Sequence, residues 1–232
     1  MEGDGRAMSW RADLLRDVAR RIPVGGPGCV LVGVDGVDGS GKSTFANELA
    51  DVVLLSRAVI RISVDDFHHG RAVRYRRGRD SPEGYWQDAF DYQRLRRFVL
   101  DPLGPGGSSL YRLVGHDLAT DQALDPEPEA APPGCVVIVD GVFLHRDELA
   151  DVWQFSVFLR VPFEETVMRM ARRDGTPADP SHPILHRYVQ GQRLYFARCS
   201  PEQRASIVID NCDLDRPILV SAVAGTEAVN PS

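Results

Sequence analysis

The sequence predicts an α/β fold, in which a parallel sheet is covered by helices on both faces. Short apolar runs rich in β-branched residues recur along the chain, and such runs are typical of strands that are buried on both sides. Segments with helical periodicity separate these runs, and strands that alternate with helices form βαβ units. The chain has 232 residues, of which 43% are hydrophobic and 26% charged, so it is long enough to bury one full core.

The first helix is expected over residues 9–22, where one helical face gathers Trp10, Leu14, Leu15, Val18 and Ile22. A strand over 29–34 and a helix that ends near residue 55 follow it. The next expected elements are a strand over 59–64, a helix over 91–100 and a short strand over 110–114. The segment 101–104 is interpreted as a turn because it contains proline and glycine.

The second half of the chain continues the alternation. Strands are expected over 135–139, 155–161 and 206–209. One helix covers 162–174, with Pro162 at its first turn and Gly175 just past its end, and another helix ends near residue 199. We expect a single domain over residues 1–218, in which 174–186 is a lid region, followed by a C-terminal tail over 219–232.

The charge balance argues against some classes of partner. A net charge of −6 and a pI near 5.5 disfavour a protein that coats nucleic acid or anionic lipid, because those partners reward a positive field. No apolar run approaches the roughly 20 residues that a membrane span needs, and the first residues lack the pattern of a signal peptide. We therefore expect a cytoplasmic protein that acts on a small molecule, with a homo-oligomer left open.

The cysteines add one expectation. Four are present, at positions 29, 135, 199 and 212, and no pair has C-x-x-C spacing. Cys29 and Cys135 lie in apolar runs that are interpreted as buried strands. Free core thiols are therefore expected in place of disulfides or a zinc site.

Lys42 is the most informative single residue. The chain contains 27 basic residues, and Lys42 is the only lysine among them. Lysine is a compact charge on a thin stem, whereas arginine is a wide planar fork. The lone lysine therefore marks a position where arginine would not serve.

This lysine belongs to a phosphate-binding pattern. Residues 36–43 fit G-x-x-x-x-G-K-[ST], directly after an apolar strand and at the start of a helix. Glycines let successive backbone N–H groups turn toward one centre, Lys42 reaches the β- and γ-phosphates, and Ser43 offers a hydroxyl to Mg²⁺. The pattern predicts an ATP or GTP site made of Gly36, Val37, Asp38, Gly39, Ser40, Gly41, Lys42, Ser43 and Thr44.

Two acids complete the predicted chemistry. Asp140 ends an apolar strand, where a carboxylate can hold Mg²⁺ together with Ser43, although a helix-capping role is the simpler alternative. Asp65 ends another strand, so it emerges at the same edge of a parallel sheet and can accept the proton of a hydroxyl that attacks phosphorus. Its neighbour Asp66 competes for this role, but side chains at a strand end alternate, so one of the two faces the cleft.

In order along the chain, these features resemble the uridine kinase family of P-loop kinases, which includes phosphoribulokinase, pantothenate kinase and nicotinamide riboside kinase. The resemblance covers about residues 28–212. It rests on the phosphate loop, on segments 65–68, 87–91 and 139–141, on the spacing from Tyr111 to His116, and on the arginine helix that ends at Asp174.

The resemblance implies the P-loop NTPase fold, a three-layer sandwich with an arginine-bearing helical lid, and the transfer of phosphate from MgATP to a nucleoside such as uridine or cytidine. It implies that Asp65 is the catalytic base, that Lys42, Arg169 and Arg173 act on the phosphates, and that Asp88 binds the ribose. Tyr111 and His116 would contact the pyrimidine.

The sequence departs from the family pattern in three places. His68 replaces a tyrosine, Asp140 replaces a glutamate, and Asp117-Leu118 replaces the usual Ser-Arg.

Other functions stay open at this stage. The acceptor could be nicotinamide riboside, pantothenate or a sugar, and a P-loop NTPase without a phosphorylated product is a further alternative. A GTPase switch needs N-K-x-D, which a chain whose only lysine is Lys42 cannot supply in its usual form. The arginine-rich run 71–79 is either an acceptor-side loop or a solvated loop.

Overall fold

A six-stranded, mostly parallel sheet forms the centre of the molecule. The computed structural model describes residues 4–26 and 28–222. In spatial order the strands are β10 (Ile218–Ala222), β9 (Ile207–Asp210), β8 (Phe155–Arg160), β1 (Val30–Gly36), β7 (Val136–Gly141) and β2 (Val59–Ser63). All neighbours pair in parallel except β10, which is antiparallel to β9. The predicted α/β fold is confirmed.

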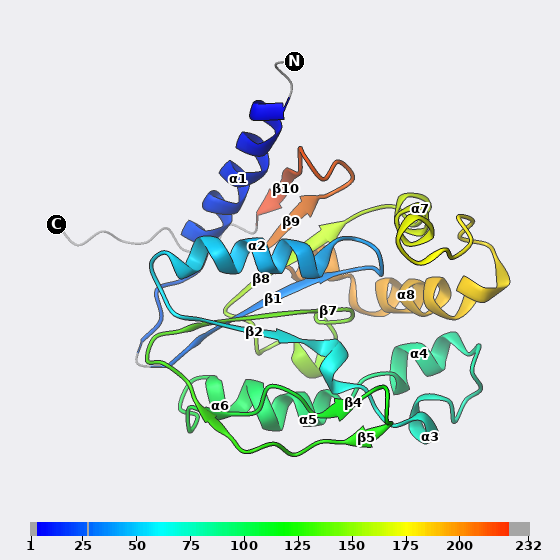
Figure 1. Cartoon of the computed structure of the whole chain (residues 1–232), viewed down its shortest axis with the longest axis horizontal. Coiled ribbons are helices and arrows are strands. Elements are labelled where there is room, and N and C mark those ends of the chain that lie inside the picture. Colours follow the sequence, from blue (N-terminus) through cyan, green and yellow to red (C-terminus); the bar gives the residue numbers. More distant parts are fainter. Residues whose placement is uncertain (1–3, 27, 223–232) are drawn as a thin grey trace.

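Helices cover both faces of this sheet. Helices α1 (Asp4–Arg21) and α2 (Lys42–Leu54) lie on one face, and α5 (Tyr92–Leu95), α6 (Asp101–Leu103) and the elements around them lie on the other (Figure 1). Alternation along β1 explains the two cores: Val30, Val32 and Val34 pack with α1 and α2, whereas Leu31 packs with the opposite layer.

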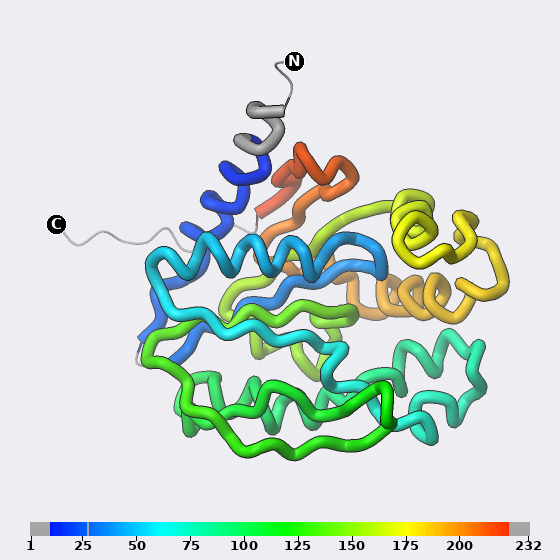
Figure 2. The backbone as a smooth tube through the Cα atoms, in the orientation of Figure 1, coloured from blue at the N-terminus to red at the C-terminus, as the bar shows by residue number. Residues whose placement is uncertain are grey.

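The remaining elements are the helices α4, α7 and α8 and several short helices, strands and turns. Helix α7 (Phe163–Asp174) and α8 (His186–Cys199) are joined by residues 175–185, and α4 (Pro82–Asp88) packs on α8 (Figure 2). Gly175 ends α7 in the left-handed conformation, with φ 70°, as its position after the helix predicts. The shorter elements are α3 (Arg71–Arg74), α9 (Pro201–Arg204), two-residue strands β3 (Leu110–Tyr111), β4 (His116–Asp117), β5 (Gln122–Ala123) and β6 (Glu129–Ala130), and 3₁₀ turns over Val64–Phe67, Asp147–Leu149 and Pro183–Leu185.

Several predicted boundaries are wrong. The helix expected over 91–100 continues through a π-helical stretch, Arg96–Leu100, into α6, so Asp101 and Pro102 are helical and Gly104 follows the helix end. The strand expected over 110–114 has only the two residues of β3, paired with β6. Helix α1 begins at Asp4, and Trp10, expected on its buried face, is 61% exposed.

The expected C-terminal tail also needs correction. Strand β10 extends to Ala222, so the segment predicted as a tail from residue 219 begins with an edge strand of the sheet. Residues 223–232 lie outside the described part of the chain. The extents of the single domain and of the lid region stay predictions.

The expectation of free core thiols is wrong for two cysteines. Cys29 and Cys135 form a disulfide, with their Cα atoms 4.7 Å apart. These residues immediately precede β1 and β7, whose register places Val30 opposite Val136, so the two cysteines lie side by side. Their separation of 106 residues in sequence hides this neighbourhood. Cys199 and Cys212 are free thiols.

No helix in the segments 4–26 and 28–222 is both long and apolar enough to cross a membrane.

Gly141 is fixed by the packing at the end of β7. A Cβ atom on this glycine would lie 2.5 Å from Cβ of Val64, which is itself fully buried. Gly141→Ala should therefore lower the free energy of unfolding by about 1–3 kcal/mol, the usual cost of overpacking a core.

Thermal or denaturant unfolding measures this loss. The matched control is Gly28→Ala, whose Cβ would meet its nearest neighbour, the carbonyl oxygen of Gly104, at an ordinary 3.9 Å. Equal stability of the two variants would contradict the packing argument.

Candidate active site

A cavity of about 810 Å³ opens at the carboxyl edge of the sheet. The ends of β1, β2 and β7 meet there because parallel strands point in one direction. Helix α7 and the segment around Leu214 contribute further walls. Ten of the sequence-predicted site residues line this cavity: Asp38, Gly39, Gly41, Lys42, Ser43, Thr44, Asp65, Asp140, Arg169 and Arg173.

The phosphate loop has the backbone shape that its glycines permit. Gly39 and Gly41 have φ of 77° and 89°, in the left-handed region that disfavours other residues. A Cβ on Gly39 would also lie 2.7 Å from the carbonyl oxygen of Thr166 in α7. Gly41 caps α2, so the free N–H groups of this helix begin at the loop. The loop is a ready-made anion cradle.

Lys42 and Ser43 begin α2 and line the cavity. The ammonium of Lys42 donates to the carbonyl oxygen of Val37 at 2.8 Å, so it crosses the phosphate loop. The Ser43 hydroxyl donates to Asp140 Oδ2 at 2.6 Å. The other oxygen of Asp140 accepts from Arg61 of β2 at 2.6 Å.

The donor set fits Mg²⁺. A hydroxyl and a carboxylate oxygen are hard ligands, and Mg²⁺ is usually held by one or two protein oxygens together with phosphates and water. Residues 4–26 and 28–222 contain no cluster of three or more acidic, histidine or cysteine side chains that could hold a metal ion by itself. Ser43 and Asp140 are thus the residues that would hold the ion beside the nucleotide.

Asp65 lines the same cavity as the phosphate loop. It stands in the 3₁₀ turn after β2, where its N–H is capped by Ser63 Oγ at 3.3 Å. Burial raises the pKa of the Asp65 carboxyl above its ordinary value, and the charge of His68 opposes that rise. Asp66 is not among the described residues that line the cavity, so the structure places Asp65 at the cleft.

Asp38 makes contacts that the sequence did not reveal. Its Oδ2 accepts from the Tyr85 hydroxyl at 2.8 Å and from Gln192 Nε2 at 2.6 Å. Tyr85 belongs to α4 and Gln192 to α8, so this carboxylate ties the phosphate loop to both helices. Burial, followed by the charge of Asp38, raises the pKa of Tyr85 well above its ordinary value, so the phenol stays a donor.

The two predicted lid arginines differ in how they are held. Arg169 is fixed by Glu165 at 2.9 Å and by the carbonyl oxygens of Asn211 and Cys212 at 2.9 and 2.7 Å. Arg173 is 71% exposed and pairs only with its neighbour Asp174 among the described residues. Arg169 is thus tied to three groups of the cavity wall, whereas Arg173 is held only by an exposed pair with its neighbour among the described residues.

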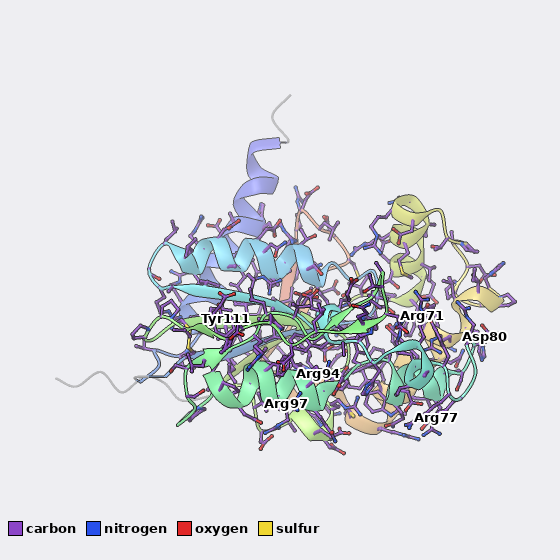
Figure 3. All side chains as sticks on the ribbon, turned by 60° about the horizontal axis from the view of Figure 1, so that its bottom comes forward. Arg71, Arg77, Asp80, Arg94, Arg97 and Tyr111 are labelled. Atoms are coloured by element: carbon purple, nitrogen blue, oxygen red, sulfur yellow. A yellow bond between two sulfur atoms is a disulfide. The ribbon has the colours of Figure 1, made fainter. Side chains whose placement is uncertain are left out.

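The three predicted acceptor-binding residues do not join this group: Asp88, Tyr111 and His116 are absent from the cavity lining in the described chain. Tyr111 packs in the core beside Glu129 of β6, and Figure 3 shows it well apart from Arg71 and Arg77. His116 is buried in β4, with Nε2 3.4 Å from Asp121.

Asp88 is engaged by the arginine-rich loop. Its carboxylate accepts from Arg76 and, at 2.8 Å, from Arg77. Burial alone would raise the pKa of Asp88, but these hydrogen bonds outweigh it and hold the pKa below its ordinary value. The run 71–79 therefore supplies a partner for a buried acid, which neither earlier interpretation of this loop anticipated.

Further residues that were not predicted as site residues also line the cavity. Arg11 of α1 pairs with Glu48 of α2 at 2.7 Å and donates to the carbonyl oxygen of Leu214 at 2.8 Å. The aromatic residues His68, Tyr85, Phe90 and Tyr188 line the part of the cavity that contains Asp65. His68 and Phe90 belong to the segments 65–68 and 87–91 that carry the family resemblance, whereas no sequence signal marks Tyr85 or Tyr188.

A phosphate loop at the end of a central parallel strand, with an acid at the end of the adjacent strand, is the arrangement typical of P-loop proteins. The chain has the fold of the P-loop kinases.

Comparisons with protein families and with curated proteins found no match to this chain. Solved structures do resemble it. A protein from Bacillus stearothermophilus, provisionally named a uridine kinase, superposes with a TM-score of 0.66 and 24% identity over 85% of this chain and 96% of its own. A protein from Silicibacter sp. TM1040, provisionally named a fructose transport system kinase, superposes with a TM-score of 0.62 and 26% identity over 82% of this chain and 95% of its own.

Phosphoribulokinase from Rhodobacter spheroides gives a TM-score of 0.55 and 15% identity, over 80% of this chain and 71% of its own. The expected resemblance to the uridine kinase-like P-loop kinases is therefore confirmed at the level of the fold.

The raised pKa of Asp65 predicts how stability depends on pH. The folded state binds the proton more tightly than the unfolded state, so the charged carboxylate destabilises the fold once the pH exceeds the ordinary pKa, near 3.9. Asp65→Asn should raise the Tm at neutral pH, and this gain should vanish below about pH 4.

Melting curves from pH 3 to 8 check this prediction, with Asp80→Asn on the exposed loop before α4 as the control. A lower Tm for Asp65→Asn at pH 7 would contradict the assigned shift.

Proposed function

We propose that the protein is an ATP-dependent small-molecule kinase, which transfers the γ-phosphate of MgATP to a hydroxyl of a nucleoside-like acceptor. The observation that carries this proposal is the position of Asp65 in the same cavity as Lys42, Ser43 and Asp140. A P-loop NTPase that only hydrolyses nucleotide needs an ordered water, whereas a kinase needs a base beside a space for a second substrate.

The chain's own residues have separate tasks in this reaction. Backbone N–H groups of residues 36–43 and the Lys42 ammonium bind the phosphates, and Ser43 with Asp140 would hold Mg²⁺, which neutralises charge on the β- and γ-phosphate oxygens when bound. Arg169 and Arg173 supply positive charge from the α7 side, where charge accumulates on the transferred group.

Phosphoryl transfer forms one bond to phosphorus and breaks another. The acceptor oxygen forms a bond to the γ-phosphorus while the bond from that phosphorus to the bridging oxygen of ADP breaks, and ADP leaves with the electron pair. Asp65 accepts the proton of the acceptor hydroxyl. Its raised pKa makes it a stronger base than an ordinary aspartate.

The acceptor side favours a ring-bearing molecule. The rings of His68 and Phe90 pack at a tilt of 43° with centroids 4.4 Å apart, and Tyr85 meets Tyr188 edge to face at 5.0 Å, so aromatic side chains border the space beside Asp65. Such side chains pack well against a base or a sugar ring. Uridine and cytidine are therefore the first acceptors to test, with nicotinamide riboside, pantothenate and simple sugars as alternatives.

Roles for Asp88, Tyr111 and His116 in nucleoside binding stay predictions. For Asp88 that role requires the acceptor to compete with Arg76 and Arg77 for the same carboxylate.

ADP release measured with each acceptor in turn tests the proposed function. We expect one acceptor to raise the rate of ADP release far above that of ATP alone, with GTP compared as donor. Lys42→Ala should lower this rate by about 10²- to 10³-fold, because it removes a charge from the β- and γ-phosphate site. Lys42→Arg should fail nearly as badly, since the wide planar guanidinium does not replace a compact ammonium on a thin stem. Hydrolysis that no acceptor accelerates would indicate an NTPase instead.

Asp65 and Asp66 give a matched pair for the catalytic base. Asp65→Asn should lower kcat by about 10²- to 10⁴-fold and leave nucleotide affinity intact, whereas Asp66→Asn should have much less effect. In the wild-type enzyme kcat should rise with pH through the elevated pKa of Asp65, because only the carboxylate accepts a proton. Steady-state kinetics across pH measure both effects, and a dead Asp66→Asn enzyme beside an active Asp65→Asn enzyme would reverse the assignment.

A further inference from the structure

Arg61 is the one described guanidinium that contacts Asp140. It lies on β2, the edge strand beside β7, in register with Ile138. Its Nη2 donates to Asp140 Oδ1 at 2.6 Å, while Ser43 donates to Oδ2 at the same distance. Both oxygens of the predicted metal-holding carboxylate therefore have a partner within the protein.

The arginine is held from three elements. Its Nε donates to Asn47 Oδ1 at 3.1 Å, one turn after Ser43 in α2, and its Nη1 donates to the carbonyl oxygen of Ile138 in β7. The side chain is 25% exposed, and that of Asp140 is 3% exposed. This planar fork is fixed in place, so its charge stays beside the metal-holding oxygens.

Arg61 differs from the other cations of the site. Lys42, Arg169 and Arg173 line the cavity where phosphates would lie, but Arg61 is not among the described lining residues. It reaches the site only through Asp140. A role in binding the nucleotide directly is therefore unsupported, and a role through the carboxylate follows.

We infer that Arg61 is a positioning residue for the divalent cation, an inference that rests on the proposed function. It neutralises Asp140, locks Oδ1 away from the metal and leaves only Oδ2, beside Ser43, to meet the ion. A fixed positive charge next to a cation site weakens cation binding by Coulomb repulsion. Arg61 thus lowers the affinity of the nucleotide-bound protein for Mg²⁺ while it orients the acid that receives the ion.

The test measures metal affinity and not turnover. Isothermal titration of the full-length protein with ADP, in EDTA and then at a series of free Mg²⁺ concentrations, gives the fold increase in ADP affinity that saturating Mg²⁺ produces. In Arg61→Gln this increase should be about 3- to 10-fold larger than in the wild type, the size expected when one unit charge is removed near a partly solvated site. Affinity for ADP in EDTA should not rise, because the Asp140 carboxylate that Arg61 no longer neutralises repels the phosphates.

Two further variants separate charge from packing. Arg61→Lys keeps the positive charge but loses the planar guanidinium, and it should show the same Mg²⁺-dependent increase in ADP affinity as the wild type. Arg57→Gln removes an arginine from the segment before β2, where it donates to the carbonyl oxygen of Pro23, and should also leave the effect unchanged.

An unchanged or smaller Mg²⁺ effect in Arg61→Gln overturns the inference, as does an equal increase in Arg61→Lys. If Arg61→Gln fails to fold, Arg61→Lys decides, since a change in its Mg²⁺ effect contradicts the charge argument. Wild-type protein that binds no ADP under either condition would instead overturn the proposed function, and with it this inference.

Discussion

The site depends on the parallel register of three strands. Because β1 pairs with β7, and β7 with β2, their carboxyl ends open at one edge of the sheet. The phosphate loop, Asp140 and Asp65 each follow one of these strands, so residues far apart in sequence reach a common cavity. Every chemical role assigned to the protein relies on that alignment, because no single segment supplies both the phosphate cradle and the base.

The acidic side chains of the site differ in whether a hydrogen-bond donor or a positive charge compensates them. Two acids that border the cavity are held by specific donors: Asp140 by Ser43 and Arg61, and Asp38 by Tyr85 and Gln192. Asp65 lacks an arginine partner among the described residues, and its pKa is raised by burial. In the proposed reaction Asp65 takes up a proton, and a carboxylate with that role gains from such isolation, whereas carboxylates that orient other groups gain from tight donors.

The sequence predicted those parts of the site that local patterns encode. The phosphate loop needs glycines and a lysine at fixed spacing, and acids at strand ends can be found once the strands are known, so Lys42, Ser43, Asp65 and Asp140 were predictable. Contacts between elements that are distant in sequence were not predictable from such patterns. Arg61 and Gln192 carry no motif, and only the folded sheet and the packing of α8 bring them to the loop. The Cys29–Cys135 pair escaped prediction for the same reason, because the neighbourhood of β1 and β7 is a property of topology. Tyr111 and His116 were assigned by their order along the chain, which carries no information on how the loops around them fold.

The hydrogen bonds of Asp38 have a thermodynamic consequence. One carboxylate joins the loop that would cradle the donor phosphates to the helices that carry the acceptor wall, through Tyr85 and Gln192. Any ligand that alters this junction changes the free energy of the other site, and linkage requires the effect to be mutual: whatever factor the nucleotide adds to acceptor affinity, the acceptor adds to nucleotide affinity. In the proposed reaction the affinities for nucleotide and acceptor are therefore coupled through this one shared contact.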